Sequence, residues 1–322
     1  MRLVLAAMLV ASCGLATGDD SQFNGRWDIT INGDSTRGRA WWLEVTGAGG
    51  DVLRGKFVGA PGGQLDEIPK LSIQDGELRF VFDRRYLHDQ RGLQKGLYWA
   101  RLEDGKLKGT FEIEGDPSTY LEWTGVRAPV LTDKDDGTWK RGDAVTLFDG
   151  KDLTGWQSLP PLPSAKPSGW TVKDGNLVNN PNAHDLVSEK KFFNFDLHVE
   201  YSIGARSNSG IGLRGRYELQ LFDDYGDPPS RHGNGAIYGR IAPKTNASGP
   251  AGEWQTLDIR LIGRQVSENL NGMKVIDKAT IDGLTAMAID ANEGDPGPFT
   301  LQGDLGNVEF RKIVVYPLLK AH

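Results

Sequence analysis

The chain has 322 residues, of which 38% are hydrophobic and 25% are charged, so it is long and apolar enough for two globular domains and is not disordered by composition. Its formal net charge is −6, and it has no basic block that could follow a phosphate backbone, which argues against nucleic acid as a partner. Many of its 42 glycines stand in Asn-Gly, Asp-Gly and Gly-Gly turns between short β-rich runs, which predicts an all-β protein.

The first 18 residues are typical of an export signal. A single basic residue, Arg2, precedes an apolar run over residues 3–11, which is too short to span a membrane. Cys13, the only cysteine, follows small residues as in bacterial lipoprotein signals, so one alternative is lipidation of Cys13 and membrane attachment. The other is cleavage near Gly18, which removes Cys13. Both predict an exported protein, either periplasmic or on the outer surface.

Residues 21–128 are expected to form a small β-barrel-like domain. Seven strand-like runs, from residues 26–31 to residues 120–126, alternate with turn signals such as Asn32-Gly33, which is the pattern of a meander. The Gly25-Arg26-Trp27 triplet weakly resembles the start of a lipocalin-like barrel. Aromatic pairs such as Trp41-Trp42 are expected in the core more often than in a sugar pocket.

Residues 129–143 are polar and charged with no apolar period, which is typical of an interdomain linker. Residues 144–320 then contain many short strand-like runs and no convincing helix. So many antiparallel strands predict two stacked sheets, in a concanavalin A-like jelly-roll β-sandwich.

Residues 208–224 alternate between apolar and polar side chains in a way that separates two faces of a strand. Apolar side chains occupy one parity, whereas Arg214, Arg216, Glu218 and Gln220 occupy the other. Residues 195–203 show the same alternation. If the two segments pair as neighbouring strands, their polar parities form one surface with two glutamates, a histidine and arginines. The plainer interpretation is cross-strand salt bridges on a solvated face.

A series of short motifs runs through residues 145–318. They include Leu147-Phe148-Asp149-Gly150, Leu153-Thr154-Gly155-Trp156, Asp174-Gly175-Asn176-Leu177, Asn208-Ser209-Gly210-Ile211, Tyr217-Glu218-Leu219-Gln220, Ala236-Ile237-Tyr238-Gly239, Leu301-Gln302-Gly303 and Val308-Glu309-Phe310-Arg311. In these motifs the second domain resembles the 3-keto-disaccharide hydrolase family, formerly domain of unknown function 1080. One departure is Asp304, where a histidine is expected in many relatives.

The resemblance implies a concanavalin-like fold and an enzyme that acts on sugars whose C3 hydroxyl is oxidised to a ketone. The ketone acidifies the C2 proton, so a base can remove it, the C1 group is eliminated, and rehydration gives net hydrolysis. Glu200 or Glu218 is the candidate base. Arg214, or a divalent metal cation held by Glu218 with His198 or Asp223, is the candidate stabiliser of the enolate oxygen.

Four further residues are candidates for binding the sugar by hydrogen bonds and ring stacking, namely Asn208, Gln220, Tyr238 and Trp156. A purely structural role remains the alternative for several of the candidate site residues. A lone strand histidine is usually structural, and a tryptophan in a sandwich is more often core than platform. The alternative function is a non-catalytic, lectin-like carbohydrate-binding surface protein, because one fold serves both roles. A structural surface lipoprotein is a third alternative.

Overall fold

The computed structural model describes residues 19–32, 40–59, 64–85, 92–159, 168–180, 183–303 and 306–320. The expected export signal over residues 1–18, with Cys13, and the departure at Asp304 lie outside these ranges. No helix in the described part of the chain has the length and apolar character needed to cross a membrane. The described residues form one short 3-10 helix, η1 (Asp20–Phe23), and strands that build three sheets.

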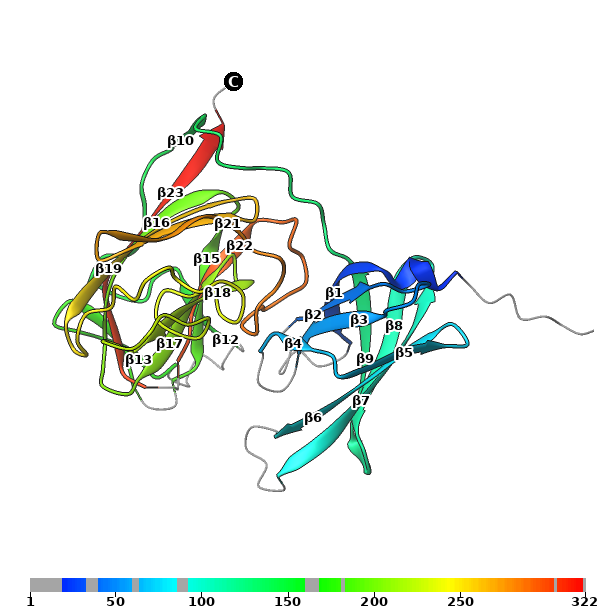
Figure 1. Ribbon diagram of the computed structural model, residues 1–322. Helices are drawn as coiled ribbons and strands as arrows, with labels where there is room; N and C mark the ends of the chain where they lie inside the picture. Colours follow the sequence, from blue (N-terminus) through cyan, green and yellow to red (C-terminus); the bar gives the residue numbers. More distant parts are fainter. Residues whose placement is uncertain are drawn as a thin grey trace, which may run out of the picture.

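The first sheet is a curled, nine-stranded antiparallel meander, which we call the barrel (Figure 1). Its strand order is β4-β3-β2-β1-β9-β8-β7-β6-β5. The strands are β1 (Gly25–Ile31), β2 (Trp41–Thr46), β3 (Arg54–Val58), β4 (Asp66–Glu67), β5 (Lys70–Gln74), β6 (Glu77–Arg85), β7 (Leu93–Glu103), β8 (Lys106–Ile113) and β9 (Asp116–Arg127).

Aromatic side chains fill the interior of the barrel. Trp41, Phe57 and Tyr98 pack edge to face, with ring centroids 5.1 to 6.0 Å apart, and Phe80 stacks on Tyr98 at 4.5 Å. These are the favoured geometries of aromatic pairs. In β2 the neighbouring side chains of Trp41 and Trp42 point to opposite faces, as a strand requires. Trp41 therefore joins the barrel core, and Trp42 leaves it.

The other two sheets stack as a sandwich. The larger has nine strands, with the path β13-β14-β23-β16-β19-β20-β21 and with β10 and β11 paired to β23. These strands are β10 (Trp139–Arg141), β11 (Val145–Phe148), β13 (Trp170–Lys173), β14 (Asn176–Asn179), β16 (Phe195–Ile203), β19 (Trp254–Ile262), β20 (Gln265–Leu270), β21 (Met273–Thr280) and β23 (Val308–Lys320).

The smaller sheet has five strands in the order β12-β15-β22-β17-β18. They are β12 (Trp156–Leu159), β15 (Asp185–Phe192), β17 (Asn208–Leu213), β18 (Tyr217–Phe222) and β22 (Gly297–Leu301). The apolar parities of both sheets meet in one core, where Phe195 of β16 packs edge to face on Phe299 of β22 at 4.8 Å. The predicted all-β class, with a barrel-like meander followed by a concanavalin-like sandwich, is confirmed.

The segment expected to be a linker is attached to the sandwich over part of its length. β10 lies within it and pairs with the end of β23. The backbone amide of Asp135 donates to the side-chain oxygen of Gln265 at 2.9 Å, and the side chain of Lys278 donates to the backbone oxygen of Asp135. Polar composition alone does not distinguish a free linker from one that is hydrogen-bonded to a sheet.

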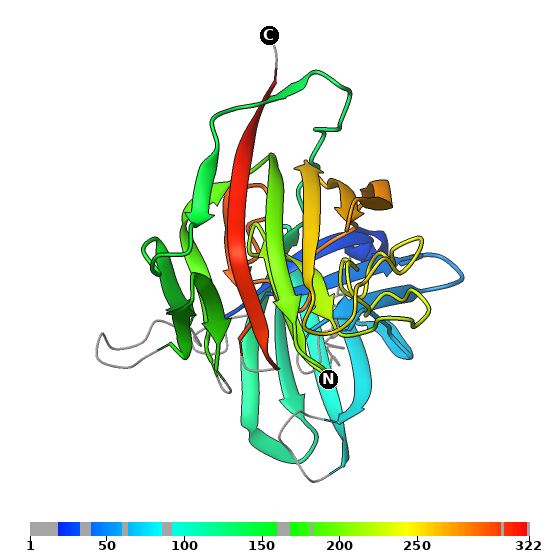
Figure 2. The ribbon, with the colours of Figure 1, turned by 90° about the vertical axis from the view of Figure 1, so that its left-hand side faces the viewer.

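The five-stranded sheet faces the barrel, and the larger sheet faces away from it (Figures 1 and 2). An apolar cluster joins the two domains, with Ala40, Trp42, Val58 and Leu65 on the barrel side and Leu284, Ala288 and Ala291 from the loop between β21 and β22. Beside it, Asp28 of β1 and Glu293 of that loop are both fully buried. The two domains therefore share an interface that combines apolar packing with buried carboxyl groups.

Candidate active site

The structure separates the two polar strand faces that the sequence analysis placed together. β16 pairs with β19 and β23 in the larger sheet, whereas β17 and β18 pair with each other in the five-stranded sheet. The apolar faces of these strands meet in the core, so their polar faces point to opposite sides of the sandwich. The expectation that Glu200 and His198 share a surface with Glu218 is wrong for this reason.

Glu200 and His198 lie on the outer face of the larger sheet, where charged partners surround them. His198 Nδ1 is 2.8 Å from a carboxylate oxygen of Asp258, and its Nε2 is 3.3 Å from Glu200. Arg311 donates to the other oxygen of Glu200, and Lys312 Nζ is 3.7 Å away. Burial works to raise the pKa of Glu200, but the hydrogen bonds from Arg311 and His198 outweigh it and lower that pKa. The outer face of the larger sheet therefore carries cross-strand salt bridges, as the plainer interpretation of the alternation expected.

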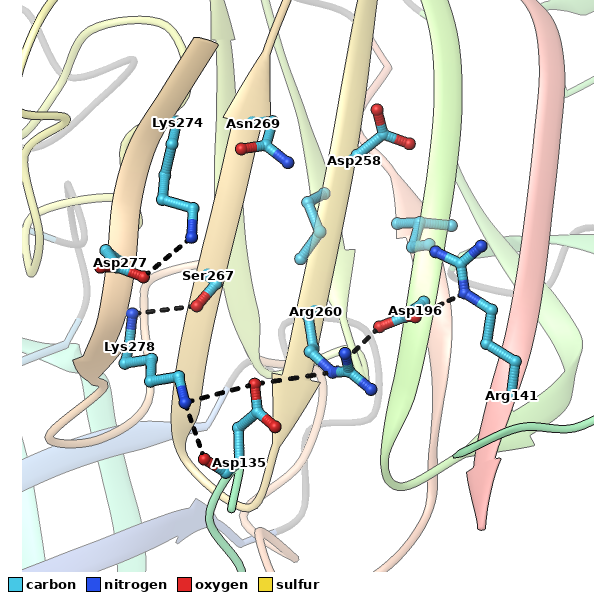
Figure 3. A pocket seen from close by; sticks show the side chains of 12 residues that line it. Asp135, Arg141, Asp196, Asp258, Arg260, Ser267, Asn269, Lys274, Asp277 and Lys278 are labelled. Atoms are coloured by element: carbon cyan, nitrogen blue, oxygen red, sulfur yellow. Dashed lines mark hydrogen bonds and ion pairs between the residues drawn. The ribbon is translucent and has the colours of Figure 1, made fainter. Parts of the chain in front are cut away.

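A shallow hollow of about 240 Å³ adjoins these residues on the same face (Figure 3). Its charged side chains pair with one another. Asp196 accepts from Arg141 at 2.6 Å and lies 3.4 Å from Arg260, and Lys278 lies 3.8 Å from Asp135. Because opposite charges neutralise each other here and fasten the segment before β10 to the sheet, the hollow has a structural explanation.

A second polar surface lies on the outer face of the five-stranded sheet, toward the barrel, and we call it the polar floor. It consists of Asn208, Glu218, Gln220, Thr300 and Gln302 around Gly210 and Gly212. Gly212 is paired with Glu218 on one side and with Thr300 on the other. Gly210 is paired with Gln220, and its carbonyl accepts the backbone amide of Gln302 at 2.9 Å. Residues opposite one another share a face, so two rows of polar side chains flank two glycines.

The two glycines let the polar groups of these rows lie close above the strand backbone. A Cβ on Gly212 would lie 2.0 Å from the Thr300 hydroxyl oxygen, and a Cβ on Gly210 would lie 3.1 Å from a carboxylate oxygen of Glu218. Side chains at these positions would collide with the polar groups of the floor. Glycine inside a strand often marks such a close approach.

The polar floor has hydrogen-bonding capacity that the described residues do not use. Gln220 donates through its side-chain amide to Asn208 at 3.0 Å. The side-chain oxygens of Gln220, Thr300 and Gln302 are buried, and none has a hydrogen-bond partner within the described ranges. Buried polar atoms are nearly always paired in folded proteins, so these three oxygens are a concentration of unused hydrogen-bonding capacity on one side of the sheet.

A rim segment, residues 236–241, borders the floor beside β18. The backbone amide of Gln220 donates to the carbonyl oxygen of Ala236, and the backbone amide of Tyr238 donates to the backbone carbonyl oxygen of Glu218, each at 2.9 Å. Burial and the nearby Glu218 charge raise the pKa of Tyr238, which keeps its hydroxyl protonated. The ring of His232 lies 5.0 Å from that of Tyr238, edge to face. Burial, followed by the charge of Arg231, lowers the pKa of His232.

Arg214 does not reach the polar floor, and its predicted role as a stabiliser of the enolate is corrected. It is fully buried, and its guanidinium lies 4.6 Å from the Phe193 ring and 5.4 Å from the Tyr217 ring. One of its nitrogens donates to the carbonyl of Gly263, in the turn between β19 and β20 of the opposite sheet. Arg214 has a φ of 53° in the hairpin between β17 and β18, so the strand alternation does not extend through it.

Trp156 is also corrected, because it lies in the sandwich core with its indole nitrogen donating to the Leu147 carbonyl at 2.8 Å. It offers no free ring face for a sugar. Asn208, Gln220 and Tyr238, in contrast, come together around Glu218.

The predicted metal ligands His198, Glu218 and Asp223 do not form one set. His198 and Glu218 lie on opposite sides of the sandwich, and a carboxylate oxygen of Asp223 accepts the backbone amide of Arg206 at 2.7 Å. Within the described ranges, no three His, Cys, Asp or Glu side chains are grouped closely enough to hold a metal ion.

Sequence reasoning missed Thr300 and Gln302 as members of the site. Gln302 stands in the Leu301-Gln302-Gly303 motif of the family resemblance, and this was the available signal. Thr300 had none, because its place next to Gly212 depends on the pairing of β22 with β17 across nearly 90 residues of chain.

The 3-keto-alpha-glucoside-1,2-lyase-like domain matches residues 143–316, which is more than half of the chain, and the protein therefore belongs to this family. The match includes the whole polar floor and leaves out the barrel.

A curated relative from Bacteroides thetaiotaomicron, named 3-keto-disaccharide hydrolase, is 24% identical over 168 residues. The matched region covers 41% of this chain and 57% of that relative. Two crystal structures from Parabacteroides distasonis ATCC 8503 are similar at 30% and 25% identity. The first covers 59% of this chain and 91% of its own with a TM-score of 0.48, and the second covers 55% and 94% with a TM-score of 0.45.

Proposed function

We propose that the protein is an exported carbohydrate-active enzyme that cleaves 3-keto-glycosides, such as 3-keto-disaccharides, on the polar floor. The observation that carries the proposal is the polar floor itself, where a buried carboxylate, Glu218, stands among side-chain oxygens that have no hydrogen-bond partner in the described part of the chain. Membership of the 3-keto-alpha-glucoside-1,2-lyase-like family supports the choice of a keto sugar.

The reaction begins at the C2 proton, which the C3 ketone makes acidic. The base takes this proton, and the C2–H electron pair forms the C2–C3 double bond of an enolate. When the C3 carbonyl re-forms, the C1–O bond breaks and a C1–C2 double bond remains, while the departing oxygen takes up a proton. Water then adds across that double bond, placing hydroxyl on C1 and hydrogen on C2, so the net result is hydrolysis.

Glu218 is the base in this proposal, and Glu200 is not. Both are carboxylates, but Glu200 is held by Arg311 and His198 on the far side of the sandwich. Glu218 lies on the polar floor with Tyr238 beside it. A base must lie within hydrogen-bond reach of the proton that it removes, so the position of Glu218 on the polar floor supports its choice as the base.

The neighbours of Glu218 supply binding and charge stabilisation. Tyr238 keeps its proton because of its raised pKa, so it can donate a hydrogen bond to the enolate oxygen or to the departing oxygen. The side-chain oxygens of Gln220, Thr300 and Gln302 are buried without partners in the described part of the chain, and the proposal pairs them with sugar hydroxyls when substrate binds. Asn208 orients Gln220 by accepting a hydrogen bond from its side-chain amide. Each of these contacts also holds the C2–H bond in place relative to Glu218.

The proposal is tested with purified protein, a 3-keto-disaccharide and the same disaccharide before oxidation. We expect only the keto sugar to be consumed. Glu218→Gln should lower kcat by about a thousandfold, which is the usual size of a general-base contribution. Glu200→Gln is the matched control, and kcat should stay within about twofold of the parent value. A divalent cation remains an expectation from the family resemblance, so each assay is run with and without a chelator.

If every 3-keto-glycoside stays intact, with or without added divalent cations, the enzyme proposal fails. Saturable binding to an unmodified polysaccharide without product would then favour the lectin-like alternative. Export is part of the same proposal and is tested by fractionation of cells. Loss of membrane association in Cys13→Ala would support the lipid anchor.

A further inference from the structure

Glu218 lies on an open edge of the five-stranded sheet, because β18 is the last strand in the order of that sheet. Its backbone amide and carbonyl both face this edge, and two separate segments supply their partners. The Thr285 hydroxyl accepts the amide at 2.8 Å, and the carbonyl accepts the backbone amide of Tyr238 at 2.9 Å. Backbone groups at a sheet edge must find partners outside the ladder, so the position of Glu218 depends on how these two segments are held relative to each other.

Arg240 joins the two segments. It follows Tyr238 by two residues in the rim segment, and its guanidinium donates to the carbonyl of Leu284, the residue before Thr285. The loop between β21 and β22 and the rim segment are therefore linked directly beside the base. The contacts form a closed ring that leaves the amide of Glu218 and returns to its carbonyl.

The guanidinium of Arg240 is fixed on two further sides. It donates to a carboxylate oxygen of Asp282 at 2.9 Å, and the Arg240 side chain is only 1% exposed. Its central carbon lies 4.1 Å from the ring centroid of Trp42 in the barrel. A planar guanidinium can bind a carboxylate, a carbonyl and a ring face at once. Because an unpaired charge away from water is unfavourable, burial makes each polar contact costly to break.

We infer that Arg240 is a positioning residue for Glu218, which it holds in place by joining the rim segment to the loop between β21 and β22. The inference rests on the proposed function for its catalytic meaning, and it deepens that function by naming what fixes the base. Arg240 acts through backbone hydrogen bonds, on the amide side through Thr285 and on the carbonyl side through Tyr238.

Asp282→Ala tests the inference in the full-length protein, with Asp290→Ala as the matched control. Both aspartates lie in the loop between β21 and β22, with side chains 33% and 34% exposed, and each pairs with a buried guanidinium. Asp282 pairs with Arg240, whereas Asp290 pairs with Arg216 at 2.7 Å, in the hairpin before β18. Each arginine keeps a carbonyl partner in the loop when its aspartate is removed.

The control is the harsher substitution for the loop itself. Asp290 also accepts the backbone amide of Asn292 at 2.8 Å, so Asp290→Ala removes one hydrogen bond more. A general weakening of the loop should therefore be at least as large in the control. Arg240→Met is a second test variant, which removes both polar links and keeps an apolar side chain beside Trp42.

The first measurement is hydrogen exchange of the Tyr238 amide, followed by NMR without substrate. We expect this amide to exchange about tenfold faster in Asp282→Ala and in Arg240→Met, because the segment that carries it is released, and at the parent rate in Asp290→Ala. Amides of β16, in the other sheet, should exchange at the parent rate in all three variants, which separates local release from global unfolding. Equal Tyr238 rates in Asp282→Ala and Asp290→Ala would overturn the inference.

The second measurement separates kcat from KM on a 3-keto-disaccharide. Asp282→Ala and Arg240→Met should each lower kcat about tenfold and leave KM within about threefold, because the base is displaced while Thr300 of β22 stays in place. Asp290→Ala should keep kcat within about twofold of the parent. The double variant should lose no more than Arg240→Met alone, since both substitutions break one link.

A raised KM at the parent kcat in Arg240→Met would overturn the positioning role and leave the proposed function intact. If the parent protein cleaves no 3-keto-glycoside, the proposed function fails instead, and the Tyr238 exchange rates still decide the link through Arg240.

Discussion

Asp28 of the barrel and Glu293 of the sandwich form a fully buried pair of carboxyl groups across the domain boundary. Burial, together with the Glu293 charge, raises the pKa of Asp28 to about 9. Glu293 accepts hydrogen bonds from Tyr217 at 2.7 Å and from Arg264. At neutral pH Asp28 therefore keeps its proton beside Glu293.

Asp28→Asn should stabilise the protein increasingly as the pH rises. Between about pH 4 and pH 9 the native state keeps a proton on Asp28 that the unfolded chain releases. The free energy of unfolding therefore falls with rising pH in this window, by at most about 1.4 kcal/mol per pH unit. Asparagine is neutral at every pH and removes this dependence. Urea denaturation at pH 5, 7 and 9 measures it, with the exposed Asp51→Asn as control. Parallel curves for Asp28→Asn and the parent would contradict the prediction.

Glu268→Gln should also stabilise the protein increasingly as the pH rises. Glu268 in β20 is 1% exposed, and burial raises its pKa well above the usual range. Neither carboxyl oxygen has a hydrogen-bond partner among the described residues. Its proton is thus bound more tightly in the native state, and stability is lost as the pH rises above the usual pKa of a glutamate. We expect the gain in Tm from Glu268→Gln to be larger at pH 8 than at pH 5. A variant less stable than the parent at pH 8 would refute this.

Thr300→Val should raise stability and weaken substrate binding together. The Thr300 hydroxyl is buried without a partner in the described part of the chain, and an unmade hydrogen bond of this kind costs about 1 to 3 kcal/mol. Valine has nearly the same shape, so removing the hydroxyl should raise Tm while KM for a 3-keto-disaccharide increases. Thr285→Val is the control, because the Thr285 hydroxyl accepts the backbone amide of Glu218 at 2.8 Å and its loss should lower Tm.

His198→Gln should leave turnover unchanged, because His198 lies with Asp258 and Glu200 on the outer face of the larger sheet, on the opposite side of the sandwich from the polar floor. Its contacts are to Asp258 and Glu200 at half-exposed positions, where ion pairs contribute only about 0 to 1 kcal/mol. The measurement is kcat/KM on a 3-keto-disaccharide over the pH range of activity. A loss as large as that expected for Glu218→Gln would restore the outer face of the larger sheet as a site.

Much of the fold follows from local patterns in the sequence. The alternation in residues 195–203 and 208–224 predicts strands with defined inward faces, and both inward faces lie in the core. Asn208, Glu218, Gln220 and Tyr238 are on the floor or its rim, in accord with the motifs that carry the family resemblance. Arg214 and Trp156 were predicted in the site but lie in the core. The hairpin between β17 and β18 interrupts the strand alternation at Arg214, and burial of the large indole of Trp156 stabilises the core.

The sequence by itself determined the class of fold, the faces of the strands and the family. Only the tertiary structure decided which strands are neighbours, and this is why Glu200 and Glu218 ended on opposite sides of the sandwich. The alternation of apolar and polar side chains is a property of a single strand. Which strands become neighbours depends on the packing of two sheets, and the segments that pair lie too far apart in the sequence for a local pattern to show it. The same reason brings Thr300 beside Gly212 and the guanidinium of Arg240 over the ring of Trp42 in the barrel.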